Sequence, residues 1–236
     1  MIIGTGQLAK AFDNANFDDN VCIFASGVSD SNCKDNAPFE REKNLLREAL
    51  KNNVEKKFIY FSSCALSASE YPKNEYYCHK QAMEDLIQTS SDNYYIFRIP
   101  QLFGALKHHK TLINFIYESI VQNKKFTIYD GAFRYVIEIE DVKKLIKAYI
   151  SNASPCCIID ITNPYRYSIL EIVHIFEKLL GKKASYDMVN KSDEYTLDLS
   201  KMQDFIEKNE LDIDFSNNYL EKKLKEKIML LIEGVK

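Results

Sequence analysis

Five short apolar runs, separated by segments with helical periodicity, constrain the fold of this chain more than any other feature. The runs are rich in β-branched and aromatic residues, and they lie at residues 2–3, 21–24, 57–61, 94–98 and 157–160. The intervening segments 39–52 and 75–89 each place apolar side chains on one helical face. Strands that alternate with helices in this way form a parallel sheet with helices on both faces. The sequence therefore predicts an α/β protein with a doubly wound parallel sheet.

Two further helices carry start signals. Glu140 and Asp141 precede an apolar pattern at 142–150 and are predicted to cap it, since acidic groups stabilise a helix N-terminus. The segment Ser168-Ile169-Leu170-Glu171 has the spacing of a capping box, which predicts a helix that ends at Gly181.

The chain changes character after Pro155, where short helices and polar loops replace the regular alternation. No repeat, linker or low-complexity tract interrupts the sequence. We therefore expect a single domain over residues 1–236, with a small substrate-binding lobe built mainly from about 105–135 and 163–236.

Composition and charge fit a soluble enzyme. The chain has 236 residues, of which 46% are apolar, so it can bury a substantial core. With a formal charge of −3, it lacks the excess of basic residues that is typical of nucleic-acid-binding proteins. Its apolar runs are too short to span a bilayer, and a strand directly after Met1 leaves no room for a signal peptide. The six cysteines lack metal-ligand spacing. We expect a cytoplasmic protein without metal, membrane or nucleic-acid partners.

A glycine turn follows the first strand. The residues Gly4-x-Gly6-x-x-Ala9 match the G-x-G-x-x-A form, whose glycines let backbone amides approach a phosphate at a helix N-terminus. A tight strand-to-helix turn without a ligand is the alternative. The position directly after the first strand favours phosphate binding, with Gln7 and Leu8 at the start of the helix.

Tyr76 and Lys80 are four residues apart on a predicted helix, so they share one face. The preceding strand ends in Ser62-Ser63. A phenol, an ammonium and a hydroxyl can therefore converge on one carbonyl, which is a proton-transfer site for redox chemistry. Tyr219 and Lys223 have the same spacing, but they lie in a charged C-terminal segment without a neighbouring hydroxyl.

Five motifs in a shared order resemble the extended short-chain dehydrogenase/reductase family. They are the glycine turn, the serine-ended strand with residues 61–66, the Tyr76/Lys80 pair, the segment 98–104 and the segment 128–142. Within this family the chain is most similar to nucleotide-sugar epimerases, dehydratases and reductases. The turn at residues 4–8 is closest to that of dTDP-4-dehydrorhamnose reductases.

The resemblance implies a Rossmann-like fold, NAD or NADP as cofactor, a nucleotide-sugar substrate and a homodimer. The implied catalytic residues are Ser63, Tyr76 and Lys80. The implied cofactor-binding residues are Gly4, Gly6, Gln7, Leu8, Ala25, Ser26, Lys80 and Arg98. The implied substrate-binding residues are Ser63, Cys64 and Arg134.

The region after the glycine turn departs from the family's pattern. An acidic residue about 20 residues beyond the glycines normally holds the adenine ribose, and Asp30 is one candidate. The run 21–31, with its small residues and a long helix after it, is more similar to the family's fourth strand. On that interpretation the chain lacks the second and third strands, and strand 21–24 lies between strands 2–3 and 57–61. If strand 21–24 lies outside the first strand instead, Asp30 is the ribose ligand.

Several site residues have alternative interpretations. In one alignment with the family, Ser63 is the catalytic hydroxyl. In the alignment with GDP-fucose synthases, where Ser-Ser-Cys also occurs, Ser62 takes that role. Cys64 then becomes a candidate acid–base thiol, although a buried structural cysteine is the favoured interpretation. His108-His109 is predicted to be an exposed loop, and His174 to pack in a helix.

Reduction of a sugar ketone needs an acid at the oxygen, and Tyr76 is expected to supply the proton, with Lys80 lowering the pKa of its phenol. The family's dehydratases carry an added Asp-Glu pair where Cys64-Ala65 stands here. The leading expectation is NAD(P)-dependent reduction of a 4-keto nucleotide sugar in surface-polysaccharide biosynthesis. A C4 epimerase, or a degenerate non-catalytic relative that binds a nucleotide sugar, are the alternatives.

Overall fold

A computed structural model describes residues 1–13, 17–106 and 111–233 of the chain. The protein divides into two compact units. The first contains Met1–Ile99, Val142–Ile161 and Leu197–Leu211, and the second contains Pro100–Asp141, Thr162–Thr196 and Asp212–Lys236. His108 and His109 lie outside the described residues, so the expectation of an exposed loop there stays a prediction.

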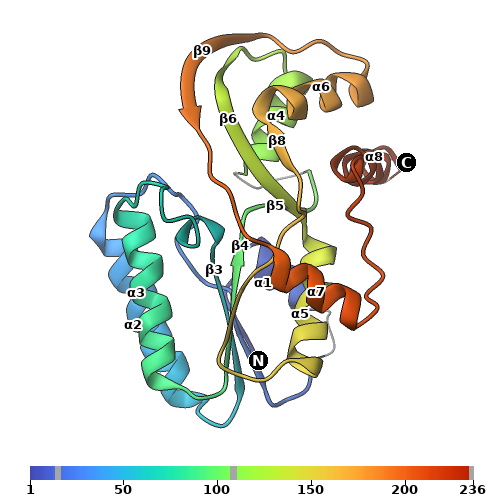
Figure 1. Cartoon of the computed structure of the whole chain (residues 1–236). Coiled ribbons are helices and arrows are strands. Elements are labelled where there is room, and N and C mark those ends of the chain that lie inside the picture. The colour runs from blue at the N-terminus through green and yellow to red at the C-terminus, as the bar shows by residue number, and fades with distance from the viewer. Residues whose placement is uncertain (14–16, 107–110, 234–236) are drawn as a thin grey trace. The chain divides into compact units, whose positions relative to one another are not determined.

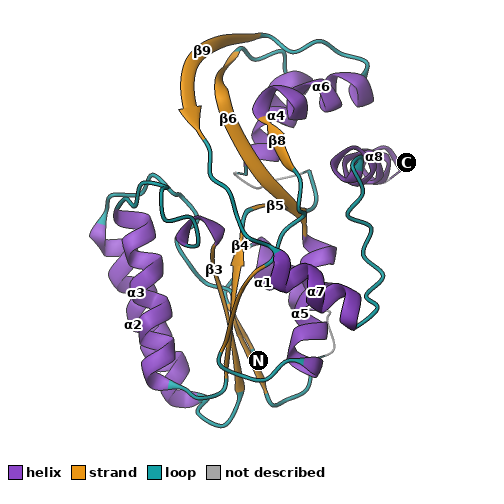
Figure 2. Ribbon diagram, in the orientation of Figure 1, coloured by secondary structure: helices purple, strands orange, loops and turns teal. Residues whose placement is uncertain are grey.

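The first unit is built on a five-stranded sheet (Figure 2). In chain order its strands are β1 (Ile2–Ile3), β2 (Val21–Phe24), β3 (Lys57–Ser63), β4 (Tyr94–Ile99) and β7 (Cys157–Asp160). They follow one another in the sheet as β1-β2-β3-β4-β7, and every neighbouring pair is parallel. The five apolar runs are therefore strands, and the predicted α/β class is confirmed.

Helices cover both faces of this sheet (Figure 1). They are α1 (Gln7–Asp13), α2 (Asn36–Asn52), α3 (Glu75–Ser90), α5 (Ile139–Asn152) and α7 (Ser200–Lys208). Leu46 of α2 and Met83 of α3 pack with Tyr60 in a buried core on one face. Phe12 of α1 contacts Phe61 on the other face. The sheet is thus doubly wound, as its alternating sequence predicts.

The position of β2 decides between the two interpretations of the shortened N-terminal half. Ile23 pairs with Ile2 of β1 on one side and with Ile59 of β3 on the other. No strand lies beyond β1 in the part of the chain that the structure describes. The interpretation that the second and third strands are missing is confirmed. The strand before Asp30 is therefore not the family's second strand, so Asp30 does not lie at the position of the ribose-binding acidic residue. In the described residues, β1 forms the edge of the sheet.

Caps fix where the helices begin. Asn74 accepts a hydrogen bond from the backbone N–H of Tyr77, so α3 starts at Glu75 and Tyr76 lies in its first turn. α5 starts at Ile139, earlier than predicted, because Glu140 and Asp141 lie inside its first turn rather than before it. Acidic groups in the first turn still interact favourably with the helix dipole.

The second unit contains a smaller sheet and three helices. The strands are β5 (Gln101–Phe103), β6 (Phe126–Glu138), β8 (Arg166–Ser168) and β9 (Tyr186–Asp193). The helices are α4 (Leu112–Val121), α6 (Ile169–Leu180) and α8 (Tyr219–Glu233). β6 pairs with each of the other three strands. The capping box at Ser168 and the left-handed Gly181 at φ 62° confirm the predicted ends of α6.

No helix in the described ranges is both long enough and apolar enough to cross a membrane.

Candidate functional site

Lys80 projects from the second turn of α3, and its ammonium is buried between α2 and the sheet. Nζ donates to Oε1 of Glu42 at 3.0 Å and to the phenol oxygen of Tyr60 at 3.1 Å. Although burial alone lowers the pKa of an ammonium, the neighbouring Tyr60 and Glu42 outweigh it and raise the pKa of Lys80. Lys80 is therefore a fixed cation at neutral pH. An ammonium has three N–H donors, so one donor is left without a partner among the described residues.

Glu42 of α2 is the centre of this buried network, with a side chain only 1% exposed. Its carboxylate accepts from Lys80, from Nε2 of His79 at 3.0 Å and from the backbone N–H of Val28 at 2.8 Å. Burial opposes ionisation, but the His79 hydrogen bond, the Lys80 charge and the Val28 amide lower the pKa of Glu42 to about 2. Because a carboxylate only accepts, Nε2 of His79 must carry the hydrogen. The buried charge of Glu42 is thus fully paired.

Tyr76 lies one helical turn before Lys80, and its ring centroid is 5.9 Å from Nζ of Lys80. The side chain is half-buried, and its phenol makes no hydrogen bond with the described residues. The expected lowering of its pKa by Lys80 is not found. Burial raises the pKa of Tyr76, and the carboxylates of Glu42 and Asp30 raise it further. Tyr76 is therefore protonated at neutral pH.

The two serines that end β3 point in opposite directions. Ser62 follows Tyr60 by two residues, so it shares the face covered by α3, whereas Ser63 lies on the other side. Ser62 is buried, and its Oγ has no partner in the described part of the chain. Ser63 is half-buried at the carboxyl end of the strand, where it caps the short helix η1 (Cys64–Leu66) through the N–H of Ala65. Ligands of parallel α/β sheets bind beyond these carboxyl ends, so Ser63 is the more accessible hydroxyl.

The glycine turn connects β1 to α1 and packs closely at Gly4 but not at Gly6. Gly4 has φ +138°, and a Cβ there would lie 2.5 Å from the carbonyl oxygen of Ala25. The turn therefore packs against the Ala25–Ser26 backbone at the end of β2. A Cβ at Gly6 would meet nothing within 4 Å, and the buried Nε2 of Gln7 lacks a partner among the described residues. An open backbone and an unsatisfied donor fit the diphosphate of a dinucleotide at this turn.

Two glycine variants test separately whether the turn is needed for the fold and whether it binds the cofactor. Gly4→Ala should destabilise the fold by about 3 kcal/mol or more, because it combines a strained φ with a clash. Gly6→Ala should change stability by less than about 0.5 kcal/mol but weaken binding of a reduced nicotinamide cofactor. Thermal unfolding and a titration followed by cofactor fluorescence measure the two effects. A destabilised Gly6→Ala variant with unchanged cofactor binding would contradict this assignment.

Arg98 and Cys64 are engaged with the protein itself. The guanidinium of Arg98 donates to both carboxylate oxygens of Glu84, at 2.9 and 2.6 Å, and to Oγ of Ser67 at 2.9 Å. Cys64 is fully buried, and its Sγ donates to the carbonyl of Arg98 at 3.1 Å. Burial, reinforced by the carboxylate of Asp160, raises the pKa of Cys64 well above its ordinary value. These contacts support structural roles, and the expected ligand contacts of both residues stay predictions.

Arg134 and the second tyrosine–lysine pair lie in the second unit. Arg134 bonds the carboxylate of Asp193 and, at 2.7 Å, its carbonyl oxygen. Its expected contact with a substrate diphosphate stays a prediction. Tyr219 is buried; its phenol donates to Asp141 at 2.8 Å and accepts from the N–H of Glu138 at 2.8 Å. This pair therefore fixes α8 to the start of α5, and the preference for the pair in α3 stays a prediction.

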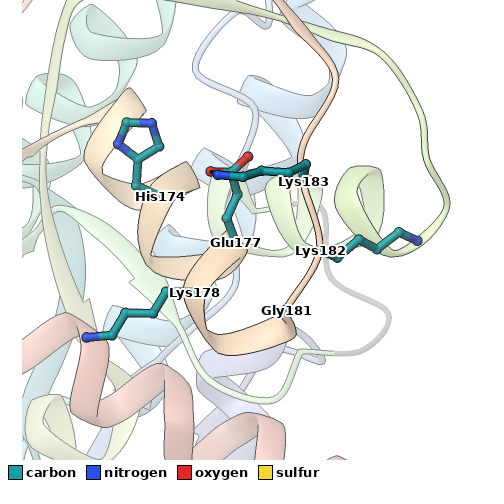
Figure 3. Close-up of a pocket in the computed structure, with 6 residues that line it drawn as sticks. All are labelled: His174, Glu177, Lys178, Gly181, Lys182 and Lys183. Carbon is teal, nitrogen blue, oxygen red and sulfur yellow. Dashed lines mark hydrogen bonds and ion pairs between the residues drawn. The ribbon is translucent and has the colours of Figure 1, made fainter.

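The hollow beside α6 is a surface feature rather than a built site (Figure 3). Lys183 pairs with Glu177 at 3.1 Å, while Lys178 and Lys182 point away from that carboxylate (Figure 3). Lys178 pairs instead with Glu221 at 2.6 Å, and its side chain is 68% exposed. His174 is exposed on the rim, so its predicted place in the core packing is wrong.

The chain matches the model of a protein family over more than half of its length. The model of the NAD-dependent epimerase/dehydratase family matches residues 6–156, which hold the second part of the glycine turn from Gly6, both serines and the Tyr76/Lys80 pair. The chain belongs to this family. No curated protein sequence matches it significantly. Because the family is NAD-dependent, NAD or NADP is the cofactor class of the chain.

Solved structures share the fold of this family member at low sequence identity. One is dTDP-glucose 4,6-dehydratase from Bacillus anthracis in complex with NAD, with TM-score 0.73 and 16% identity, covering 91% of this chain and 73% of that one. Another is UDP-N-acetylglucosamine 4-epimerase from Methanobrevibacter ruminantium, with TM-score 0.70 and 17% identity over 97% and 80% of the two chains. RMD from Pseudomonas aeruginosa, complexed with NADPH, gives 0.72 and 14% over 89% and 80%.

Three members of the site, namely Glu42, Tyr60 and His79, are not predicted from the sequence. Each lies in a segment whose apolar pattern was assigned to core packing, and a single charged residue on a helix is usually solvent-exposed. The only sequence signal is position: His79 directly precedes Lys80, and Tyr60 lies two residues before Ser62. The convergence on Glu42 depends on how α2 and α3 pack, which the pattern does not reveal.

Proposed function

We propose that this family member reduces the 4-keto group of a nucleotide sugar with NADH or NADPH. The observation that carries the proposal is the protonated, half-buried phenol of Tyr76 beside the fixed cation Lys80 at the carboxyl end of the sheet. The glycine turn at Gly4 and Gly6 provides the place for the cofactor's diphosphate. We place this activity in the synthesis of surface polysaccharides, in the cytoplasm.

The residues of this chain divide the work of such a reduction. A bound nicotinamide cofactor supplies the hydride. Tyr76 donates its phenol proton to the substrate oxygen as negative charge develops there. Ser63, at the carboxyl end of β3, holds the same oxygen by a hydrogen bond, and the remaining N–H donor of Lys80 is available to a ribose hydroxyl. The Oγ of Ser62 is buried, so Ser63 is the proposed hydroxyl.

A C4 epimerase is the second candidate, and the likeness to solved 4-epimerases favours it. An epimerase needs the tyrosine as a base in one half-reaction and as an acid in the other. It must also retain its cofactor between the two. The missing strands beside β1 favour the reductase, since they suit an exchangeable cofactor.

The test is a screen of nucleotide-linked 4-keto sugars with NADH and NADPH, followed by absorbance of the reduced cofactor. The purified protein should carry no cofactor, and turnover should consume one reduced cofactor per sugar. Tightly bound NAD together with interconversion of two 4-hydroxy epimers would support the epimerase instead. Absence of both activities with measurable binding of a nucleotide sugar would indicate a non-catalytic relative.

The serines provide a matched pair for the hydroxyl. Ser63→Ala should lower turnover by about a hundredfold, the usual effect of removing one donor to a developing oxyanion. Ser62→Ala should leave turnover unchanged and raise stability by up to about 1 kcal/mol, because it removes a buried hydroxyl without a partner. Steady-state kinetics and thermal unfolding of both variants decide which serine is the catalytic hydroxyl. The reverse pattern would assign this role to Ser62.

A further inference from the structure

Glu42 is a buried charge that the proposed reaction does not use. It lies on α2, whereas the reacting groups lie on α3 and at the end of β3. Its carboxylate nevertheless takes four hydrogen bonds, including one at 3.4 Å from the phenol of Tyr60. A buried ion pair is seldom a net source of stability compared with apolar side chains, so its presence here calls for another explanation.

We propose that Glu42 is the positioning residue for Lys80, fixing the ammonium beneath the loop after β2. The inference rests on the proposed function and adds to it a residue that neither the motifs nor the family resemblance marks.

The loop after β2 closes directly over this ion pair. The N–H of Val28 donates to Oε2 of Glu42 at 2.8 Å, and His79 donates to the same oxygen. A Cβ placed on Gly27 would lie 2.9 Å from Oε1 of Glu42 and 3.1 Å from Nζ of Lys80. The ammonium is therefore bounded by the loop after β2, by α2 and by the sheet.

The charges that face this site come from every element packed around it. Glu42 is on α2, Tyr60 on β3, Tyr76 and His79 on α3, and Asp30 on the loop after β2. Glu42 acts on both partners in the same direction, because its negative charge raises the pKa of Lys80 and of Tyr76. Removing the charge of Glu42 should therefore lower the pKa of both Lys80 and Tyr76. A change that only destabilises the fold should leave both pKa values unchanged.

Glu42→Gln provides the test, with ¹⁵N NMR of the lysine Nζ groups as the first measurement. The Lys80 resonance is assigned by its loss in Lys80→Met. Its titration midpoint should fall by about one pH unit or more in Glu42→Gln, as expected for loss of a carboxylate in contact with an ammonium. Glu138→Gln is the matched control, since Glu138 forms a comparable buried pair with Lys227 at 2.7 Å in the second unit. It should leave the Lys80 midpoint unchanged.

Kinetics give the second measurement. A displaced ammonium should weaken the proposed contact of Lys80 with the cofactor's ribose. Glu42→Gln should therefore raise the KM of the reduced cofactor about tenfold or more, whereas Glu42→Asp, which keeps the charge, should raise it less. Gly27→Ala should also raise this KM, because a Cβ there would crowd both the carboxylate of Glu42 and the ammonium of Lys80.

The outcomes separate the inference from the proposed function. If Glu42→Gln is too unstable to study, Glu42→Asp and Gly27→Ala still test whether the position of Lys80 matters. An unchanged Lys80 midpoint in folded Glu42→Gln overturns the inference, whatever the activity. A lowered midpoint in a protein without reductase activity keeps the positioning role and rejects the proposed reaction.

Discussion

Tyr76→Phe should lower turnover of a 4-keto nucleotide sugar by about a hundredfold or more, because it removes the proposed proton donor. The fold should be unaffected, since the phenol oxygen of Tyr76 makes no hydrogen bond with the described residues and the ring contact with Tyr77 is kept. Substrate and cofactor KM should change little. Steady-state kinetics with the reduced cofactor, together with thermal unfolding, measure both parts of this expectation.

Tyr77→Phe is the appropriate control for that variant. Tyr77 is the next residue on α3, is half-buried as Tyr76 is, and stacks edge-on against it at 5.2 Å. It points to a neighbouring face of the helix and should retain turnover. Wild-type turnover in Tyr76→Phe, or equal losses in both variants, would rule out Tyr76 as the acid and with it the proposed reaction.

The sequence predicts the strands of the parallel sheet in the first unit, but it does not predict those of the second unit. Short apolar runs such as residues 57–61 and 94–98 are buried on both faces, which is the pattern of a parallel strand, and all five predicted strands exist. The small residues after strand 21–24 also placed β2 between β1 and β3 correctly. β6 was missed because its alternation breaks at Asp130-Gly131, where the register with β9 shifts.

The electrostatics of the site could be predicted less well than its residues. The spacing of Tyr76 and Lys80 places them on one face of α3, as the structure has them, and a lone cation there would lower the pKa of a neighbouring phenol. The structure adds Glu42, which lies 38 residues away in sequence from Lys80. Burial raises the pKa of Tyr76, and the negative charge of Glu42 raises it further. Long-range pairing of single charged residues has no periodic signal, so it becomes visible only once α2 and α3 are packed.

This pairing has a consequence for stability as well as for chemistry. Lys80→Met leaves the carboxylate of Glu42 buried with only the donors from Val28, His79 and Tyr60. Breaking one side of a buried ion pair typically costs about 3–5 kcal/mol, which is a large part of the stability of an ordinary domain. We therefore expect Lys80→Met to lose both activity and a large part of its free energy of unfolding. Urea denaturation measures the second loss directly.

A double variant separates these two roles of Lys80. Adding Glu42→Gln to Lys80→Met removes the unpaired charge but keeps an acceptor for the N–H of Val28, so most of the lost stability should return. Activity should not return, because the cation beside Tyr76 is still absent. If the double variant is as unstable as Lys80→Met alone, the buried charge of Glu42 is not the cause of the loss. If it regains turnover together with stability, Lys80 serves the fold rather than the reaction, and the chemistry must then be assigned to Tyr76 and Ser63 without it.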